Sequence, residues 1–253
     1  MPQPPLFEFD PDPRGIINPA ERFQAGTLPE HAVVTFFSQA HDALVQAEAP
    51  PLLAHLKSCG LNYPVYKVRR GGQDIALFLS YIGAAGASAF LEELIALGAK
   101  KLLVCGGAGV LDKSIAQGHL LLPTSAVRDE GTSYHYLPPD IEATPGAEAL
   151  RALKAMLLER KVPHLECKTW TTDGVYRETR AKIAARKAQG CLSVEMEAAA
   201  FFAVAQFRQA QLAQLLYAGD DVSGDAWDHR DWDKNMGVRE MMLELCFEAV
   251  LKV

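Results

Sequence analysis

Three glycine-containing segments follow apolar runs, and each could bring the backbone close to a ligand: residues 83–86, 106–109 and 219–224. Ligands of parallel α/β sheets bind beyond the carboxyl ends of the strands. Glycine suits such positions because it permits positive φ angles and a close approach of the backbone. We therefore predict a small-molecule site at these segments, with tight turns that bind nothing as the alternative.

Two adjacent carboxylates, Asp220 and Asp221, lie in the third of these segments. In a partly buried turn their charges would repel each other, which raises the pKa of one of them toward that of a useful general acid. The alternative is a solvated acidic turn, because the chain continues with four more aspartates, Asp225, Asp228, Asp231 and Asp233.

The motifs of common cofactors are not found. Neither glycine cluster completes G-x-G-x-x-G, and about twenty residues past Gly83 the chain has Leu103 instead of the acid of a dinucleotide site. There is no P-loop and no G-x-S-x-G motif. The five cysteines, at positions 59, 105, 167, 191 and 246, form no C-x-x-C pair and no cluster with histidine. We therefore predict reduced thiols, no metal site and no bound cofactor.

Composition and charge narrow the class of protein further. The 253 residues are 49% hydrophobic and 22% charged, which is ordinary for a globular chain with a large core. The 25 basic and 31 acidic residues give a net charge of −6 without a basic stripe, so we expect neither nucleic acid nor a membrane as partner. The one basic run, residues 67–70, is typical of a solvated strand end. Without a signal peptide or a membrane-spanning apolar run, a soluble cytoplasmic protein is expected.

Apolar runs alternate with helical patterns along the chain. Buried strands are predicted at 75–82, 102–105, 118–123 and 212–218, and helices after residue 86 and at 145–160, 197–209 and 238–250. This alternation predicts an α/β fold, a three-layer αβα sandwich with a mixed, mainly parallel central sheet. Five prolines in residues 1–13 indicate an extended N-terminal arm, followed by one domain over residues 14–253.

Three sets of motifs occur in a fixed order. The first is Tyr81-Ile-Gly-Ala-Ala-Gly-Ala-Ser88 with Leu103-Val-Cys-Gly-Gly-Ala-Gly109, and the second is Ile115-Ala-Gln-Gly-His-Leu-Leu-Leu122. The third is Ser193-Val-Glu-Met-Glu-Ala198 with Ala218-Gly-Asp-Asp-Val222. Together they resemble the purine nucleoside/uridine phosphorylase family, which also contains nucleosidases. The resemblance runs from about residue 15 to residue 250. It implies the nucleoside phosphorylase fold and cleavage of the N-glycosidic bond of a nucleoside.

The resemblance implies roles for the carboxylates. Glu197 would hold the ribose hydroxyls, with Glu195 beside it and Met196 packed beneath the sugar. An ionised carboxylate suits this place, since the sugar develops positive charge as its bond to the base breaks. Asp221 matches the acid that protonates the leaving base in purine-cleaving members, which favours a purine nucleoside. For Glu197 a capping carboxylate at a helix start is the alternative.

For the base, the resemblance implies contacts from Ala108, Gly109, Val175 and Tyr176. The Gln-x-Arg pair with which relatives recognise uracil is not reproduced in residues 177–180, although Arg180 could shift into place. A mobile flap or a surface loop is expected to carry Trp227, His229, Arg230 and Trp232.

Phosphate would lie at Gly83, Gly106, Gly107 and Arg22. The phosphorylases hold it with arginines, but this chain has Val104 at one of those positions, and Arg22 is one place late at another. The arginine that a neighbouring subunit gives falls near Leu61, unless Arg69 or Arg70 substitutes there. A buried phosphate without charge partners is very costly. In the hydrolysing branch a carboxylate activates water, and Glu21 is the candidate for that role.

We therefore predict a nucleoside phosphorylase-like enzyme that uses inorganic phosphate to convert a purine nucleoside into free base and ribose 1-phosphate. A nucleosidase that uses water is the first alternative, and an inactive nucleoside-binding protein is the second. The resemblance also implies a homo-oligomer, either a dimer or a hexamer of dimers.

Overall fold

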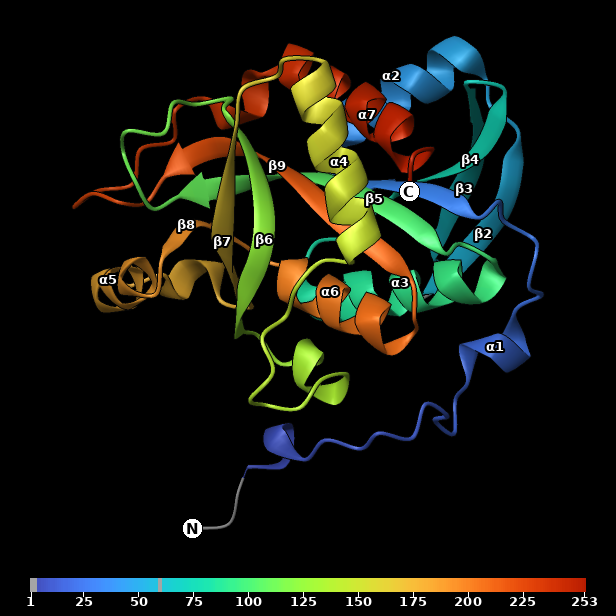
Figure 1. Ribbon diagram of the computed structural model, residues 1–253, viewed down its shortest axis with the longest axis horizontal. Helices are drawn as coiled ribbons and strands as arrows, with labels where there is room; N and C mark the ends of the chain where they lie inside the picture. Colours follow the sequence, from blue (N-terminus) through green and yellow to red (C-terminus); the bar gives the residue numbers. More distant parts are fainter. Residues whose placement is uncertain (1–3, 59–60) are drawn as a thin grey trace.

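The fold is a mixed β-sheet between two layers of helices. The computed structural model describes residues 4–58 and 61–253. Its nine strands follow the order β2-β3-β4-β1-β5-β8-β7-β6-β9, and helices cover both faces of the sheet (Figure 1). This is the three-layer α/β arrangement predicted from the sequence. Cys59 lies outside the described residues, and the other four cysteines are buried and free.

The middle of the sheet contains four parallel strands, namely β4 (Gln73–Leu79), β1 (His31–Thr35), β5 (Lys101–Val110) and β9 (Gln211–Asp221). Their sequences are nearly continuous apolar runs because both faces of the sheet are covered. The carboxyl ends of these strands lie at the same edge, so the segments that follow them meet there.

The strands on the β9 side close into a ring. β8 (Cys191–Glu195) pairs with Gly109 and Val110 at the end of β5, and the ring continues through β7 (His164–Thr172) and β6 (Leu120–Asp129). β6 pairs with β9, which returns to β5. The strand expected at 102–105 therefore runs on to Val110, since its glycines keep pairing with β8 and β9.

A hairpin of β2 (Leu52–Ser58) and β3 (Leu61–Arg70) extends the sheet at β4. The basic run 67–70 forms the end of β3, as predicted. Arg69 pairs with Asp74 at 3.0 Å, and Arg70 pairs with Glu48 at 2.7 Å and Glu244 at 2.8 Å. These charges are thus neutralised within the fold.

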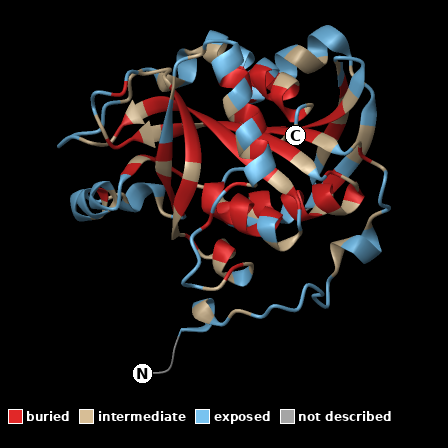
Figure 2. Cartoon of the chain, viewed as in Figure 1, coloured by how far each residue is buried: buried red, intermediate tan, exposed pale blue. Residues whose placement is uncertain are grey.

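Five helices form the two outer layers. α2 (Ser38–Glu48), α4 (Ala147–Glu159) and α7 (Met236–Val250) cover one face, and α3 (Ala84–Leu97) and α6 (Ala198–Phe207) cover the other (Figure 1). α6 is buried along nearly its whole length, because it lies between α3 and the sheet (Figure 2). The helix expected from Glu197 begins at Ala198, and Glu197 is its N-cap residue.

The remaining elements are short. They are α1 (Pro19–Arg22), α5 (Arg180–Ala188) and the 3-10 turns Pro5–Phe7, Thr132–His135, Val175–Arg177 and Trp232–Lys234. The N-terminal segment is extended and touches the fold through the Phe7 ring, 5.2 Å from that of Tyr134, and through the Pro13 carbonyl, which accepts from Arg208. Within the described ranges, no helix has the length and apolar character needed to cross a membrane.

Candidate active site

A cavity of about 440 Å³ lies at the carboxyl ends of the central strands. Its walls come from four segments: residues 36–39 after β1, 106–109 in β5, 194–197 at the end of β8, and 219–220 in β9. Single side chains complete it, namely Ile82, Val175, Glu178, Gln214, Trp232, Asp233 and Arg239. Of the three glycine segments predicted to bind a ligand, the second and third contribute directly to these walls.

Glu195 lines the cavity, but hydrogen bonds fix its carboxylate to the fold. It accepts from the Thr171 hydroxyl at 2.6 Å, from the Glu197 backbone N–H at 2.7 Å and from the Ala198 backbone N–H at 2.6 Å. Two of these donors are the otherwise unpaired amides at the start of α6, where a negative charge is stabilised. Glu195 therefore holds the turn that presents Met196 and Glu197.

Glu197 is the carboxylate that this turn presents to the cavity. It is 6% exposed, and its Oε1 accepts from the Gly83 backbone N–H at 2.5 Å. Gly83 caps α3 with φ +100°, so the starts of two helices, α3 and α6, meet at this side chain. Burial raises the pKa of Glu197, and the neighbouring Glu195 raises it further. The three donors to Glu195 stabilise its ionised form and counteract the effect of burial on its pKa.

The stability of the ligand-free protein is expected to fall as the pH rises from about 6 to 8. The pKa values of Glu195 and Glu197 are raised by burial above those of the unfolded chain. Between the pKa that each carboxyl has in the unfolded chain and its higher pKa in the folded state, the folded protein binds more protons. Unfolding therefore becomes easier as the pH increases. Thermal unfolding at the two pH values measures this. The Glu197→Gln variant, which cannot ionise, should show a smaller drop in Tm, by about 2–4 °C for each kcal/mol removed. An equal drop in both proteins would contradict the assignment.

Asp220 and Asp221 have different surroundings at the end of β9, where the register against β5 shifts between Ala108 and Val110. Asp221 does not line the cavity. Its carboxylate pairs with Arg230 at 2.5 Å and accepts from the Ser223 backbone N–H at 2.7 Å. Asp220 does line the cavity, and its Oδ2 accepts from the Trp227 indole N–H at 2.6 Å. The sequence predicted Asp221 as the acid, but of the two aspartates only Asp220 lines the cavity.

The end of the cavity near Asp220 contains the positions predicted for the base. Ala108, Gly109 and Val175 line it, whereas Tyr176 is 97% exposed and does not. A Cβ at Gly109 would lie 3.1 Å from Val194 and 3.3 Å from the Asp220 carboxylate, so the glycine keeps this wall open.

Glu178, which lies between the turn Val175–Arg177 and α5, lines the same end of the cavity. Burial, and secondarily the charge of Asp220, raise the pKa of Glu178 to about 7. Arg180, the predicted alternative reader of the base, is instead exposed and bonds Asp225.

The predicted phosphate residues are only partly brought together. Gly106 and Gly107 line the cavity, and the Gly83 N–H binds Glu197. Arg22 ends α1 and lies over the Phe23 ring, and Glu21 pairs with Arg14 at 2.7 Å, so neither residue reaches the cavity. Val104 is buried in the core, and Leu61, Arg69 and Arg70 belong to the outer strand β3.

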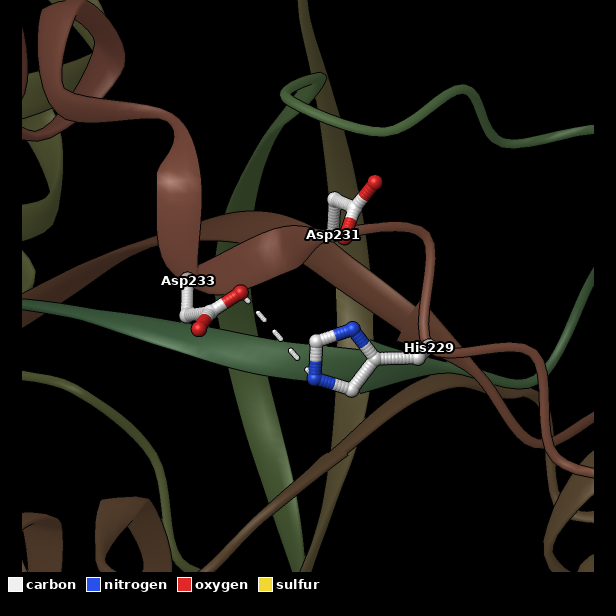
Figure 3. A group of neighbouring side chains, drawn as sticks. All are labelled: His229, Asp231 and Asp233. Carbon is white, nitrogen blue, oxygen red and sulfur yellow. Dashed lines mark ion pairs between the residues drawn. The ribbon is translucent and has the colours of Figure 1, made fainter.

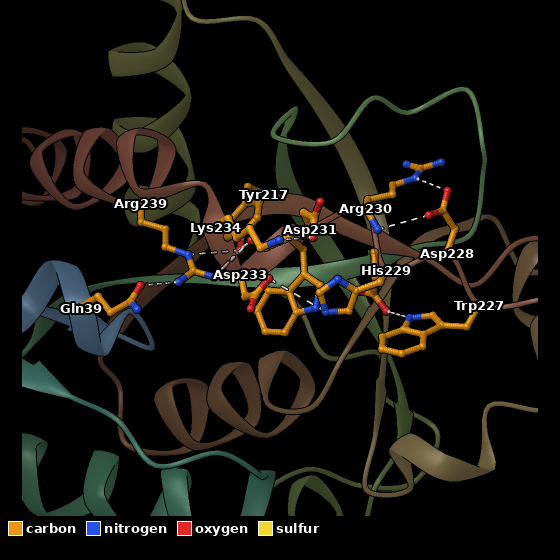
Figure 4. Close-up of polar contacts among 12 residues, drawn as sticks. Gln39, Tyr217, Trp227, Asp228, His229, Arg230, Asp231, Asp233, Lys234 and Arg239 are labelled. Carbon is orange, nitrogen blue, oxygen red and sulfur yellow. Dashed lines mark hydrogen bonds and ion pairs between the residues drawn. The ribbon is translucent and has the colours of Figure 1, made fainter.

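The loop after β9 forms an outer wall through Trp232 and Asp233. His229, Asp231 and Asp233 gather there with ligand atoms within 4.8 Å of one another (Figure 3). Asp233 lies 4.0 Å from His229, and Asp231 pairs with Lys234 at 2.7 Å (Figure 4). These contacts tie the loop together, with the Lys234 ammonium as the partner of Asp231 and the His229 imidazole beside Asp233.

Several cavity residues escaped sequence analysis. Asp220 lies where the register of β9 against β5 shifts, so period-two alternation gives no usable signal for it. Ser38, Gln39 and Gln214 carry no motif, and Arg239 lies within a helix whose orientation the sequence leaves open.

Comparison with known proteins agrees with this arrangement. The sequence model of the Phosphorylase superfamily matches residues 30–252. Guanosine phosphorylase of Halorubrum lacusprofundi is 26% identical over 173 residues, which cover 66% of this chain and 72% of that protein. Uridine phosphorylase of Treponema pallidum is 30% identical over 153 residues, which cover 56% of this chain and 59% of that protein.

Solved structures show the same fold. Purine nucleoside phosphorylase from Toxoplasma gondii superimposes with a TM-score of 0.76 at 19% identity, covering 90% of this chain and 93% of that one. AMP nucleosidase from Bacteroides thetaiotaomicron gives a TM-score of 0.72 at 22% identity, covering 88% of each chain. The family match spans the sheet and every segment that lines the cavity, and on this ground the chain belongs to the Phosphorylase superfamily.

Proposed function

We propose that this protein is a nucleoside phosphorylase that cleaves a purine nucleoside with inorganic phosphate. The observation that carries the proposal is the presence of Glu197 and Asp220 in one cavity at the carboxyl ends of the strands. One carboxylate can stabilise a positively charged sugar while the other gives a proton to the leaving base.

The reaction follows from these positions. Glu197 accepts hydrogen bonds from the ribose hydroxyls, and its negative charge stabilises the oxocarbenium-like sugar. A phosphate oxygen bonds to C1′ as the bond from C1′ to the base nitrogen breaks. The electron pair of the broken bond passes to the base, which takes a proton from Asp220 and leaves neutral. Asp220 then regains a proton from solvent, and ribose 1-phosphate is released.

Two observations favour phosphorolysis over hydrolysis. Glu21, the candidate base for activating water, is paired with Arg14 outside the cavity. The relatives at 26% and 30% identity are phosphorylases. The nucleosidase remains the second candidate, since AMP nucleosidase shares the fold. We also propose a homo-oligomer, because Ile82 at the cavity is an exposed apolar residue that a second subunit could cover; sedimentation velocity tests this.

The proposed function is tested by measuring the release of free base with and without phosphate. The substrates are inosine, guanosine, adenosine and uridine. Phosphate-dependent release from purine nucleosides together with ribose 1-phosphate is the expected result. Release without phosphate would establish the nucleosidase. Binding of nucleoside without any release would instead establish the inactive binding protein.

Glu178→Gln is expected to change which purine is preferred. An ionised carboxylate accepts two hydrogen bonds and matches the N1–H and 2-amino donors of guanine, whereas a glutamine offers one donor and one acceptor and matches adenine. At pH 8 the ratio of kcat/KM for guanosine to that for adenosine should fall at least about tenfold, because one charged hydrogen bond to guanine is lost. Glu159→Gln, an exposed residue paired with Lys252, is the control. An unchanged ratio would remove Glu178 from base recognition.

A further inference from the structure

We propose that Arg239, on α7, binds the phosphate group that enters this cavity. The inference rests on the proposed function. It assigns a cation to the phosphate group, because the positions expected for phosphate-binding arginines hold Val104 and Leu61 in this chain. Among the described residues, Arg239 is the one basic side chain that lines the cavity.

The charge of Arg239 is buried without an ionic partner. The residue is 7% exposed, and within the described parts of the chain no carboxylate oxygen lies within 4.0 Å of its guanidinium. Its hydrogen bonds go to neutral acceptors: the Tyr217 hydroxyl at 3.0 Å, the Trp232 carbonyl at 3.2 Å and the Gln39 amide oxygen at 3.4 Å (Figure 4). By contrast, the less buried Arg70 and Arg230 have carboxylates at 2.5–2.8 Å. A buried cation of this kind favours an anion as its partner.

Three aromatic rings hold the guanidinium in place. Its carbon lies 5.6 Å from the ring centre of Phe37, 5.8 Å from Tyr217 and 5.6 Å from Trp232. Such rings stabilise a cation without neutralising it, and they exclude water around it. An interaction between Arg239 and an anion is therefore stronger here than at a wet surface.

The surroundings of Arg239 suit a phosphate group. Ser38 and Gln39 line this part of the cavity and carry hydroxyl and amide donors, and Gly106 and Gly107, predicted for phosphate from the sequence, lie on the wall. A Cβ at Gly107 would lie 3.3 Å from the Tyr217 ring, whose hydroxyl binds Arg239. Gly107, which the sequence predicted for phosphate, and Arg239, which it did not predict, therefore lie on two sides of the same residue, Tyr217.

Carboxylates also face the cavity and oppose an anion. Asp233 lies on the same loop as Trp232, is half exposed and has His229 at 4.0 Å, and Glu197, which is ionised in the proposed reaction, lines the same cavity. Because of these charges, a phosphate needs a fixed cation to enter at all. Arg239 with its forked donors meets that requirement.

Steady-state kinetics and ligand-induced thermal shifts of Arg239→Gln test the assignment. The KM for phosphate should rise at least about tenfold, since a charged hydrogen bond is lost, while the KM for nucleoside changes less than about twofold. Phosphate should raise the Tm of the wild type and not that of the variant. Arg160→Gln, at an exposed arginine paired with Glu248 outside the cavity, is the control for loss of an arginine. Should Arg239→Gln fail to fold, Arg239→Lys carries the test with a smaller rise in the KM for phosphate.

The remaining outcomes separate the possibilities. If no nucleoside is cleaved but phosphate still stabilises the wild type and not the variant, the phosphate site stands and the proposed function falls. If the variant loses binding of a nucleoside 5′-monophosphate but not of inorganic phosphate, the group bound is that of a nucleotide and the assignment to the co-substrate is overturned. Equal stabilisation of wild type and variant by both ligands overturns the proposal altogether.

Discussion

Glu197→Gln is expected to lower kcat/KM for the preferred nucleoside by about 10² to 10³, because the charge that stabilises the sugar cation is lost. Glutamine has the same shape, and its amide oxygen can still accept from the Gly83 N–H that holds the side chain at 2.5 Å. The defect should therefore arise in the reaction and leave the fold intact.

The pH dependence gives this prediction a second readout. Burial and Glu195 raise the pKa of Glu197, so in the free enzyme the useful ionised form increases as the pH rises. The wild-type kcat/KM should rise with pH through this titration, and the rise should be reduced in Glu197→Gln. If the kcat/KM of Glu197→Gln lay within twofold of the wild-type value and its pH profile were unchanged, the role of Glu197 would be limited to capping α6.

Asp220→Asn is expected to lower kcat for purine nucleosides by about 10² to 10⁴, the usual range for loss of a general acid. Asparagine can still accept from the Trp227 indole, which now bonds Asp220 at 2.6 Å, so the loop should keep its place. The loss should nearly vanish for 7-methylguanosine, whose base already carries a positive charge and leaves without taking a proton.

Asp221→Asn distinguishes the two neighbouring aspartates. Because Asp221 pairs with Arg230 and lies off the cavity, its replacement should lower the Tm, and any loss of activity should be equal for guanosine and 7-methylguanosine. If 7-methylguanosine restored the activity of Asp221→Asn but not that of Asp220→Asn, Asp221 would be the acid, as predicted from the sequence.

Features of the chain that depend on local pattern were predictable. Apolar runs marked four of the nine strands, β4, β5, β6 and β9, and the alternation of strands and helices predicted the layers. The segment containing Glu195 and Glu197 was found through its resemblance to the family motif, and the structure places both in the cavity.

The cavity residues that the sequence did not predict depend on where strands end and on which way helices face. β9 runs three residues beyond the predicted end at Ala218, and this extension decides that Asp220, and not Asp221, faces the cavity. Arg239 contacts Tyr217, 22 residues earlier, only because α7 packs against the end of the sheet. Glu178 lies in an irregular connection without any periodic pattern. Such contacts arise from tertiary packing, which a single sequence does not specify.

The ring formed by β5, β8, β7, β6 and β9 determines how molecules can enter and leave the cavity. The described strands of this ring offer no free edge through which a wall could separate, so the walls that can move are the irregular ones, among them the loop after β9. That loop is attached to consecutive residues of β9, by Trp227 to Asp220 and by Arg230 to Asp221. A wide opening has to release both attachments. Under the proposed function, movement of this loop would control the admission of the nucleoside and the departure of the base, while the sheet keeps the cavity carboxylates in place.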